Sequence, residues 1–266
     1  MSALAPIVAF DLDDTLAPSK SALDPEMAAI LAELVAVTDV AVISGGQFSQ
    51  FESQLLAPLA QAGAVRPTRL HVLPACGTQY YRFTDDGWER VYVEALSPDE
   101  RSRAFAALEQ AARTLGLWSD ERAWGPIIED RESQVTFSAL GQQAPIAEKE
   151  AWDPDGTRKH ALREAVAALL PGLEVRTGGT TSLDVTRRGR DKAYGIGRLC
   201  AQTGLDRDDI LFFGDQLQPG GNDNPVLQLG VACIAVTQWR DTADHLRARL
   251  DQSADVRSGN HVVTTP

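Results

Sequence analysis

The stretch Ile-Val-Ala-Phe-Asp-Leu-Asp-Asp-Thr, residues 7 to 15, joins an apolar run to a cluster of acids. Residues 8 to 10 are typical of a buried parallel strand, and the run ends in Asp11, Asp13 and Asp14. Such a strand delivers carboxylates to its carboxyl edge, where ligands bind in open α/β sheets. Because neighbouring carboxylates repel one another unless a cation lies among them, the stretch predicts a site for a hard divalent ion such as Mg²⁺. The alternative is an acidic turn with Asp14 as a helix cap.

Alternating strands and helices flank this stretch on both sides. Apolar spacing predicts helices at 25–37 and 48–60 and strands at 40–43 and 70–74. The same alternation resumes with a helix from Lys192 and with strands at 210–213 and 231–236. Alternation of this kind predicts an α/β fold with a doubly wound parallel sheet.

Between these parts the order of elements changes. Strand 88–94 is followed by a helix that starts at Ser97-Pro98, with Glu100 placed for a capping box, and runs to about Leu115. A pair of strands follows at 127–129 and 134–139, then a helix at 158–170, and then a second pair of strands at 174–177 and 182–186. We therefore predict an α+β domain at 86–187, an antiparallel sheet with two helices, inserted into a core made of residues 1–85 and 188–266.

Composition restricts the function further. The formal net charge of -12 argues against nucleic acid or an anionic membrane as partner, because both require a basic surface. The three cysteines, Cys76, Cys200 and Cys233, are widely spaced, which favours reduced, mostly buried thiols. With no basic leader before a long apolar segment, we expect a cytoplasmic protein. The oligomeric state is open, and a homodimer through the inserted domain is one arrangement considered.

Four short motifs, taken together, resemble the signatures of the haloacid dehalogenase superfamily. The first is Asp-Leu-Asp-Asp-Thr-Leu at 11–16, and the second is the apolar segment at 40–46 that contains Ser44. Lys192 resembles the third, and Leu-Phe-Phe-Gly-Asp at 211–215 with Gly-Gly-Asn-Asp at 220–223 resembles the fourth. Alone, each residue has a simpler interpretation, such as Ser44 capping a helix or Lys192 facing solvent.

The resemblance implies a Rossmann-like core, an inserted cap domain and Mg²⁺-dependent phosphoryl transfer. Asp11 would be the nucleophile that forms an aspartyl phosphate, and Asp13 the general acid and base. The residues implied to hold the phosphoryl group are Thr15, Ser44 and Lys192, and those implied to hold the metal are Asp11, Asp13, Asp215 and Asp223.

Longer segments narrow the resemblance to subclass IIB and to the eukaryotic-type phosphomannomutases. They are Ser-Gly-Gly-Gln-Phe at 44–48, Ile-Glu-Asp-Arg at 128–131, Gly-Gly-Thr-Thr-Ser-Leu-Asp-Val at 178–185 and the fourth signature extended by Pro219. In that family the cap selects the substrate. The implied substrate-binding residues are Lys20, Arg131, Lys149, Ser182 and Asp184, although Arg131 as a surface ion pair and Asp184 as an exposed strand residue are the simpler alternatives.

Departures from the family pattern shape the functional prediction. Gln142 stands where the family has an arginine, Lys20 and Lys149 replace two further arginines, and Asp14 replaces a glycine. A weaker cationic grip favours hydrolysis over retention of a bisphosphate. From the sequence we therefore predict a phosphatase acting on a sugar phosphate or similar small phosphorylated metabolite. Phosphomannomutase activity is the alternative, and a non-catalytic sugar-phosphate sensor is a remote one.

Overall fold

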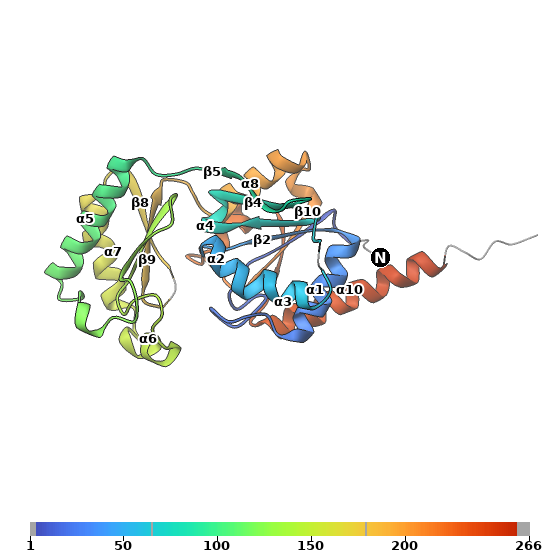
Figure 1. Ribbon diagram of the computed structural model, residues 1–266, viewed down its shortest axis with the longest axis horizontal. Helices are drawn as coiled ribbons and strands as arrows, with labels where there is room; N and C mark the ends of the chain where they lie inside the picture. Colours follow the sequence, from blue (N-terminus) through green and yellow to red (C-terminus); the bar gives the residue numbers. More distant parts are fainter. Residues whose placement is uncertain (1–3, 65, 179, 260–266) are drawn as a thin grey trace, which may run out of the picture. The chain divides into compact units, whose positions relative to one another are not determined.

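The chain divides into two compact units in a computed structural model that describes residues 4–64, 66–178 and 180–259 (Figure 1). The first unit combines Met1–Tyr92 with Asp191–Pro266, and the second is Val93–Arg190. Among the described residues, no helix has both the length and the apolar character needed to cross a membrane.

A seven-stranded sheet organises the first unit. Its order is β11-β10-β1-β2-β3-β4-β5, and the pairings from β11 to β3 are parallel, while β4 runs antiparallel to β3. The strands are β1 (Ile7–Phe10), β2 (Asp39–Ile43), β3 (Leu70–Leu73), β4 (Gln79–Thr84), β5 (Gly87–Val93), β10 (Ile210–Gly214) and β11 (Ala232–Ala235). Because β2 and β10 lie on opposite sides of β1, the strand order reverses beside β1, which is where open sheets bind ligands.

Helices cover both faces of this sheet. On one face lie α1 (Pro25–Val37), α2 (Phe48–Phe51), the π-helix η1 (Glu52–Leu56), α3 (Ala57–Gln61) and α10 (Trp239–Gly259). On the other lie α8 (Lys192–Thr203) and α9 (Asn224–Gln228). The short elements α4 (Pro74–Gly77) and η3 (Arg207–Asp209) complete the unit. The doubly wound arrangement predicted from the sequence is thereby confirmed.

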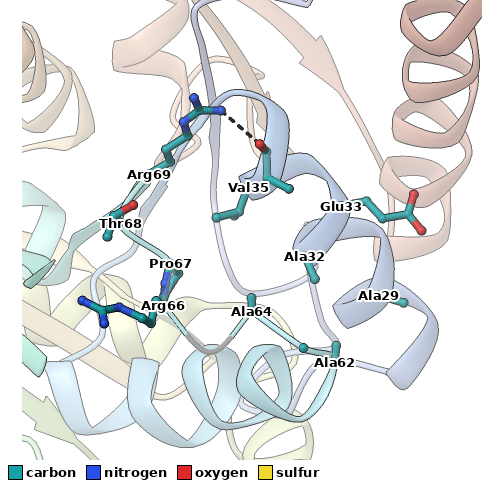
Figure 2. Close-up of a pocket in the computed structure, with 12 residues that line it drawn as sticks. Ala29, Ala32, Glu33, Val35, Ala62, Ala64, Arg66, Pro67, Thr68 and Arg69 are labelled. Atoms are coloured by element: carbon teal, nitrogen blue, oxygen red, sulfur yellow. Dashed lines mark hydrogen bonds between the residues drawn. The ribbon is translucent and has the colours of Figure 1, made fainter. Parts of the chain in front are cut away.

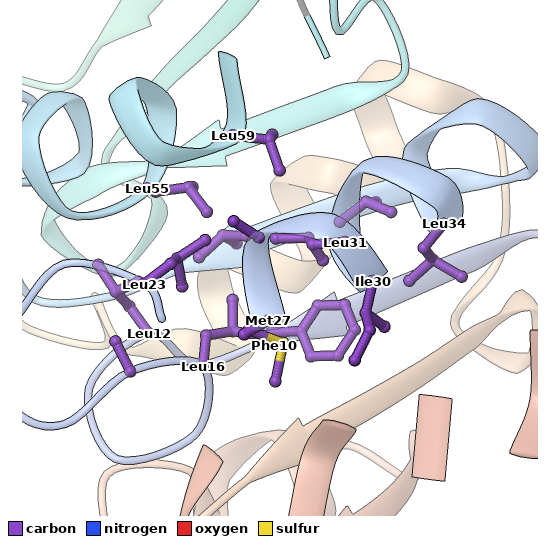
Figure 3. Packing of buried hydrophobic residues seen from close by; sticks show 14 of the residues in the cluster. Phe10, Leu12, Leu16, Leu23, Met27, Ile30, Leu31, Leu34, Leu55 and Leu59 are labelled. Atoms are coloured by element: carbon purple, nitrogen blue, oxygen red, sulfur yellow. The ribbon is translucent and has the colours of Figure 1, made fainter. Parts of the chain in front are cut away.

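Helix α1 illustrates how the sequence builds the layer that supports β1. Asp24 accepts a hydrogen bond from the Glu26 backbone N–H at 2.9 Å, and Pro25 occupies the first turn, where its missing N–H costs nothing. Met27 and Leu31 are fully buried against Phe10 and its neighbours (Figure 3). Each such side chain contributes about 1.5–3 kcal/mol on burial, so this layer holds the strand that carries the acids.

The second unit is an antiparallel sheet in the order β6-β7-β9-β8, with one face covered by α5 and α7 (Figure 1). Its elements are α5 (Pro98–Thr114), η2 (Asp120–Arg122), β6 (Ile128–Asp130), β7 (Gln134–Ser138), α6 (Ile146–Trp152), α7 (Thr157–Leu169), β8 (Leu173–Thr177) and β9 (Ser182–Arg187). Ser97 and Glu100 form the predicted capping box at the start of α5. Alternate residues such as Val135, Phe137 and Leu183 form the core, which leaves the opposite face polar.

Several predicted details were wrong. We assigned strand 88–94 to the inserted domain, but β5 pairs with β4 in the first sheet, so the units divide after Tyr92 and after Arg190. The predicted helix 48–60 is interrupted by the π-helical turn η1. The strand β4 and the helices α6, α9 and α10 were not predicted from the sequence. The three cysteines are half-buried rather than mostly buried, and within the part of the chain that the structure describes none of them forms a disulfide.

Candidate active site

Asp11 lies where β1 ends, beside the reversal of strand order. Its backbone N–H donates to the Phe213 carbonyl at 3.0 Å, which extends the pairing of β1 with β10 by one residue. The side chain is only 4% exposed. The apolar strand therefore presents a buried carboxylate at the carboxyl edge of the sheet, as its sequence predicted.

Lys192, the first residue of α8, reaches this carboxylate. Its Nζ lies 2.7 Å from Asp11 Oδ1 and 2.6 Å from Asp223 Oδ1, and all three side chains are buried. Burial lowers the pKa of Lys192, but the two carboxylates outweigh burial and shift it upward. Lys192 is therefore a fixed positive charge beside the candidate nucleophile, and the surface role considered above is excluded.

Asp223 positions Lys192. While its Oδ1 accepts from the lysine, its Oδ2 accepts from the Gln216 backbone N–H at 3.1 Å. A Cβ at Gly214 would lie 2.5 Å from that same Oδ2, so the strand end next to Asp223 has room only for glycine. Both carboxylate oxygens of Asp223 are thus engaged by the protein.

One carboxylate oxygen from each of Asp11, Asp215 and Asp223 lies within 4.8 Å of the other two. Burial raises the pKa of Asp11 well above its ordinary value even though Lys192 opposes the shift, and burial followed by Asp223 raises that of Asp215. One lysine cannot neutralise three carboxylates, and every donor is a hard oxygen. This donor set fits a divalent cation such as Mg²⁺, with Asp11 and Asp215 as the side chains best placed to hold it.

Thr15 forms a hydrogen bond with Asp215 in this structure. Its hydroxyl donates to Asp215 Oδ1 at 3.3 Å, and its carbonyl accepts from the hydroxyl of Thr242 at 2.7 Å. Both threonines are fully buried. Thr15, which the resemblance placed at the phosphate, therefore orients a candidate metal ligand, and Thr242 of α10 anchors it. No sequence motif pointed to Thr242.

In the loop after Asp11, the side chains of Asp13 and Asp14 accept hydrogen bonds from the loop backbone. The Lys20 backbone N–H donates to Asp13 Oδ1 at 2.6 Å, and the Ser19 N–H donates to Asp14 Oδ1 at 3.1 Å. Asp14 has φ 61°, a left-handed conformation that explains why a glycine suits this position in the resembling family. Burial raises the pKa of Asp13, partly opposed by the Lys20 N–H, which favours the protonated form that a general acid needs.

Ser44 follows β2, the strand next to β1, so it lies at the same edge of the sheet as Asp11. Its side chain is 4% exposed, and its Oγ accepts from the Gly46 N–H at 3.3 Å. This bond orients the loop in which a phosphoryl-binding serine is expected.

The remaining predicted residues lie in the second unit. Asp184 accepts from the Thr136 hydroxyl at 2.7 Å, directly across the β7–β9 ladder, and Ser182 lies two residues earlier on the same polar face. Arg131 follows β6, and its Nε lies 2.6 Å from a Glu129 carboxylate oxygen. Lys149 of α6 is buried, and its Nζ donates to the Gln142 backbone carbonyl at 3.1 Å. Lys149 and Gln142, two of the departures from the family pattern, thus contact each other.

A cavity of about 570 Å³ elsewhere in the first unit is not part of this site (Figure 2). Its lining includes Ala29 of α1 and Thr68 and Arg69 before β3, and the Arg69 guanidinium donates to the Ala36 carbonyl at 3.0 Å. Because the lining segments precede β2 and β3, the cavity lies toward the amino ends of the strands. Asp11 is at the opposite, carboxyl edge.

Comparison with solved structures identifies the fold. The chain is similar to an N-terminally truncated, IMP-bound IMP-nucleotidase from Plasmodium falciparum, with TM-score 0.67 at 14% identity over 94% of this chain and 68% of that one. It is also similar to a haloacid dehalogenase-like hydrolase from Bacteroides thetaiotaomicron, with TM-score 0.60 at 16% identity, covering 93% of this chain and 99% of the other. These likenesses show a haloacid dehalogenase fold, as expected.

Sequence comparison identifies the family. Phosphomannomutase 1 of Mus musculus is 27% identical over 227 residues, covering 80% of each chain. A probable phosphomannomutase of Caenorhabditis elegans is 26% identical over 230 residues, covering 83% of this chain and 85% of the relative. The sequence model of the family described as eukaryotic phosphomannomutase matches residues 27–252, a range that includes Ser44, Lys192 and Asp215. The chain belongs to the eukaryotic phosphomannomutase family.

Proposed function

We propose that this protein is a phosphomannomutase-type phosphotransferase, which moves a phosphoryl group between the 1 and 6 positions of a hexose phosphate. The observation that carries the proposal is the buried Asp11–Lys192–Asp223 cluster at the carboxyl edge of the sheet, in a chain of this family. The relatives favour this reaction, our alternative from the sequence, over the phosphatase that we preferred.

In this proposal Asp11 attacks a phosphorus of hexose 1,6-bisphosphate, becomes an aspartyl phosphate and releases a hexose monophosphate. The free hydroxyl of a hexose 1-phosphate then attacks the aspartyl phosphate, which regenerates the bisphosphate and frees the Asp11 carboxylate. Asp13 donates a proton to the departing sugar oxygen and later takes one from the hydroxyl that receives the phosphoryl group. Lys192 and Ser44 hold the phosphoryl oxygens. Asp11 and Asp215 would hold a divalent cation, whose positive charge would offset repulsion between carboxylate and phosphoryl oxygens. Arg131, Ser182 and Asp184 of the second unit hold the sugar phosphate, with Arg131 on the distal phosphate.

Hydrolysis is the second candidate function, because of the contact between Lys149 and Gln142. The position that carries arginine in the family is neutral at Gln142, and the ammonium of Lys149 donates to the Gln142 backbone carbonyl. Each lost charge-assisted contact is worth about 1.5–3 kcal/mol, or about one to two decades in retention of the hexose monophosphate bound to the phosphoenzyme. A hexose monophosphate that leaves the phosphoenzyme early exposes the aspartyl phosphate to water.

The two functions differ in their products. Purified protein with Mg²⁺ and a catalytic amount of hexose 1,6-bisphosphate should convert mannose 1-phosphate or glucose 1-phosphate to the 6-phosphate faster than it releases inorganic phosphate. Phosphate release that exceeds 6-phosphate formation would refute the mutase and establish the phosphatase. A Gln142→Arg variant provides the matched comparison, because restored charge should raise the ratio of 6-phosphate to phosphate.

A further inference from the structure

Gly195 lies one turn after Lys192, in the first turn of α8. Asp191 caps this helix by accepting from the Tyr194 N–H at 3.0 Å, and Lys192 extends from its first position into the acidic cluster. The place of the lysine ammonium therefore depends on where the first turn of α8 lies against the sheet.

The first turn of α8 rests on another backbone at a distance that only glycine permits. A Cβ at Gly195 would lie 2.3 Å from Ile43 Cδ1, 2.7 Å from the Cys76 carbonyl oxygen and 3.1 Å from Gly77 Cα. In the reverse direction, a Cβ at Gly77 would lie 2.3 Å from Gly195 Cα. The Ile43 side chain can rotate away, but the Cys76 and Gly77 atoms belong to the main chain and cannot move without moving the turn.

The segment 75–77, against which α8 packs, is itself in an unusual conformation. Ala75, Cys76 and Gly77 have φ of 47°, 55° and 81°, so three successive residues, two of them not glycine, are left-handed. Such strain persists only where surrounding contacts impose it, and it concentrates at functional sites. Here the Cys76 N–H donates to the Ser44 carbonyl and the Ala75 N–H to the Gly46 carbonyl, each at 2.9 Å.

These contacts form a continuous backbone connection from the Ser44 loop, through the turn 75–77, to α8. We propose that Gly195 is a positioning residue, whose contact with Cys76 and Gly77 sets the separation of Ser44 and Lys192. The inference rests on the proposed function, in which these two residues hold the transferring phosphoryl group. No motif or comparison assigned a role to Gly195. Because a misplacement of about 1 Å can cost on the order of 100-fold in rate, the contact controls catalysis without touching substrate.

The test is Gly195→Ala, with Gly197→Ala as its matched control. Both glycines lie in α8, but a Cβ at Gly197 meets nothing within 4 Å. We expect Gly195→Ala to lower kcat on hexose 1-phosphate by about 10- to 100-fold, with a much smaller change in KM, while Gly197→Ala keeps the wild-type kcat. Ile43→Val removes the nearest clashing atom and should return part of the kcat to Gly195→Ala. A folded Gly195→Ala protein with wild-type kcat would overturn the inference.

A second readout separates this inference from the proposed function. Beryllium fluoride with Mg²⁺ mimics a phosphoryl group on an aspartate, so calorimetric titration measures phosphoryl holding without any sugar. Gly195→Ala should bind this probe at least 10-fold more weakly than wild type, and Gly197→Ala equally well. Wild-type protein that binds the probe without converting hexose phosphates would refute only the proposed function. If Gly195→Ala does not fold, the Gly195→Ala/Ile43→Val protein replaces it, and wild-type probe affinity there would overturn the inference.

Discussion

Replacing Lys192 by methionine tests the electrostatics of the site most sharply. The substitution keeps an unbranched side chain but removes the cation that lies 2.7 Å from Asp11 and 2.6 Å from Asp223. Breaking a buried pair by removing one partner costs about 3–5 kcal/mol, because the remaining charge stays buried. At about 2–4 °C per kcal/mol, the first unit should melt about 6–20 °C lower in EDTA.

The loss of stability in Lys192→Met should depend on pH in one direction. Without the lysine, the pKa of Asp11, already raised by burial, rises further, so the folded variant binds protons that the unfolded chain releases at neutral pH. The deficit should therefore be largest near pH 8 and shrink toward pH 5. Thermal or urea unfolding at both pH values measures it, with Lys159→Met on α7 as the control. A deficit below about 1 kcal/mol, equal at both pH values, would refute the idea that Lys192 neutralises buried carboxylates.

Three further predictions follow from other residues. Chelation with EDTA should stop turnover and Mg²⁺ should restore it, because Asp11 and Asp215 present oxygen donors to a cation, and full activity in chelated protein would contradict this. Arg131→Gln should raise KM for a hexose phosphate by about 10-fold or more through loss of a charge-assisted contact, with far less effect on the affinity for beryllium fluoride; an unchanged KM would remove Arg131 from the site. Burial, then Arg82, lowers the pKa of His71 from 6.5 to about 3. Below pH 6.5 the imidazole of His71 binds a proton in the unfolded chain but not in the folded chain. The free energy of unfolding should therefore fall by up to about 1.4 kcal/mol per pH unit toward pH 3. Urea unfolding of His71→Leu should lack this contribution to the pH dependence.

Elements with strong local signals were predictable from the sequence. Helix α1 has its Asp24 cap, Pro25 and apolar spacing, and the structure gives the predicted range 25–37. Helix α5 has its capping box. In contrast, the π-helical turn η1 looks like ordinary helix in sequence, because the residues of a helix do not show which carbonyl each N–H will select.

The position of β5 depended on tertiary pairing. The segment 88–94 alternates like any half-buried strand, and nothing in it shows whether it joins the first sheet or the second. Its pairing with β4, which we did not predict, places it in the first sheet. The observed domain boundaries therefore differ from the predicted ones, although the architecture of each domain was predicted correctly.

Some residues of the candidate site were predictable from the sequence and others were not. Asp11, Lys192 and Asp223 were found because their motifs end strands or begin helices that meet at one edge of the sheet. Thr242 could not be found, because it reaches the Thr15 carbonyl across 227 positions of sequence from a helix face that looks merely amphipathic. Gly195 gave no signal either, since its role lies in a backbone contact that no pattern of side chains encodes.

In the proposed reaction Asp11 carries the phosphoryl group, so locating that group on the protein tests the proposal. Protein mixed with Mg²⁺ and hexose 1,6-bisphosphate, quenched in acid and digested with trypsin, yields residues 1 to 20 as one peptide, because Lys20 is its first cleavage site. Fragmentation mass spectrometry should place a phosphoryl group on Asp11, and Asp11→Asn should lack it and lose turnover by about 10⁴-fold or more. A phosphoryl group on another residue, or turnover retained in Asp11→Asn, would contradict the account.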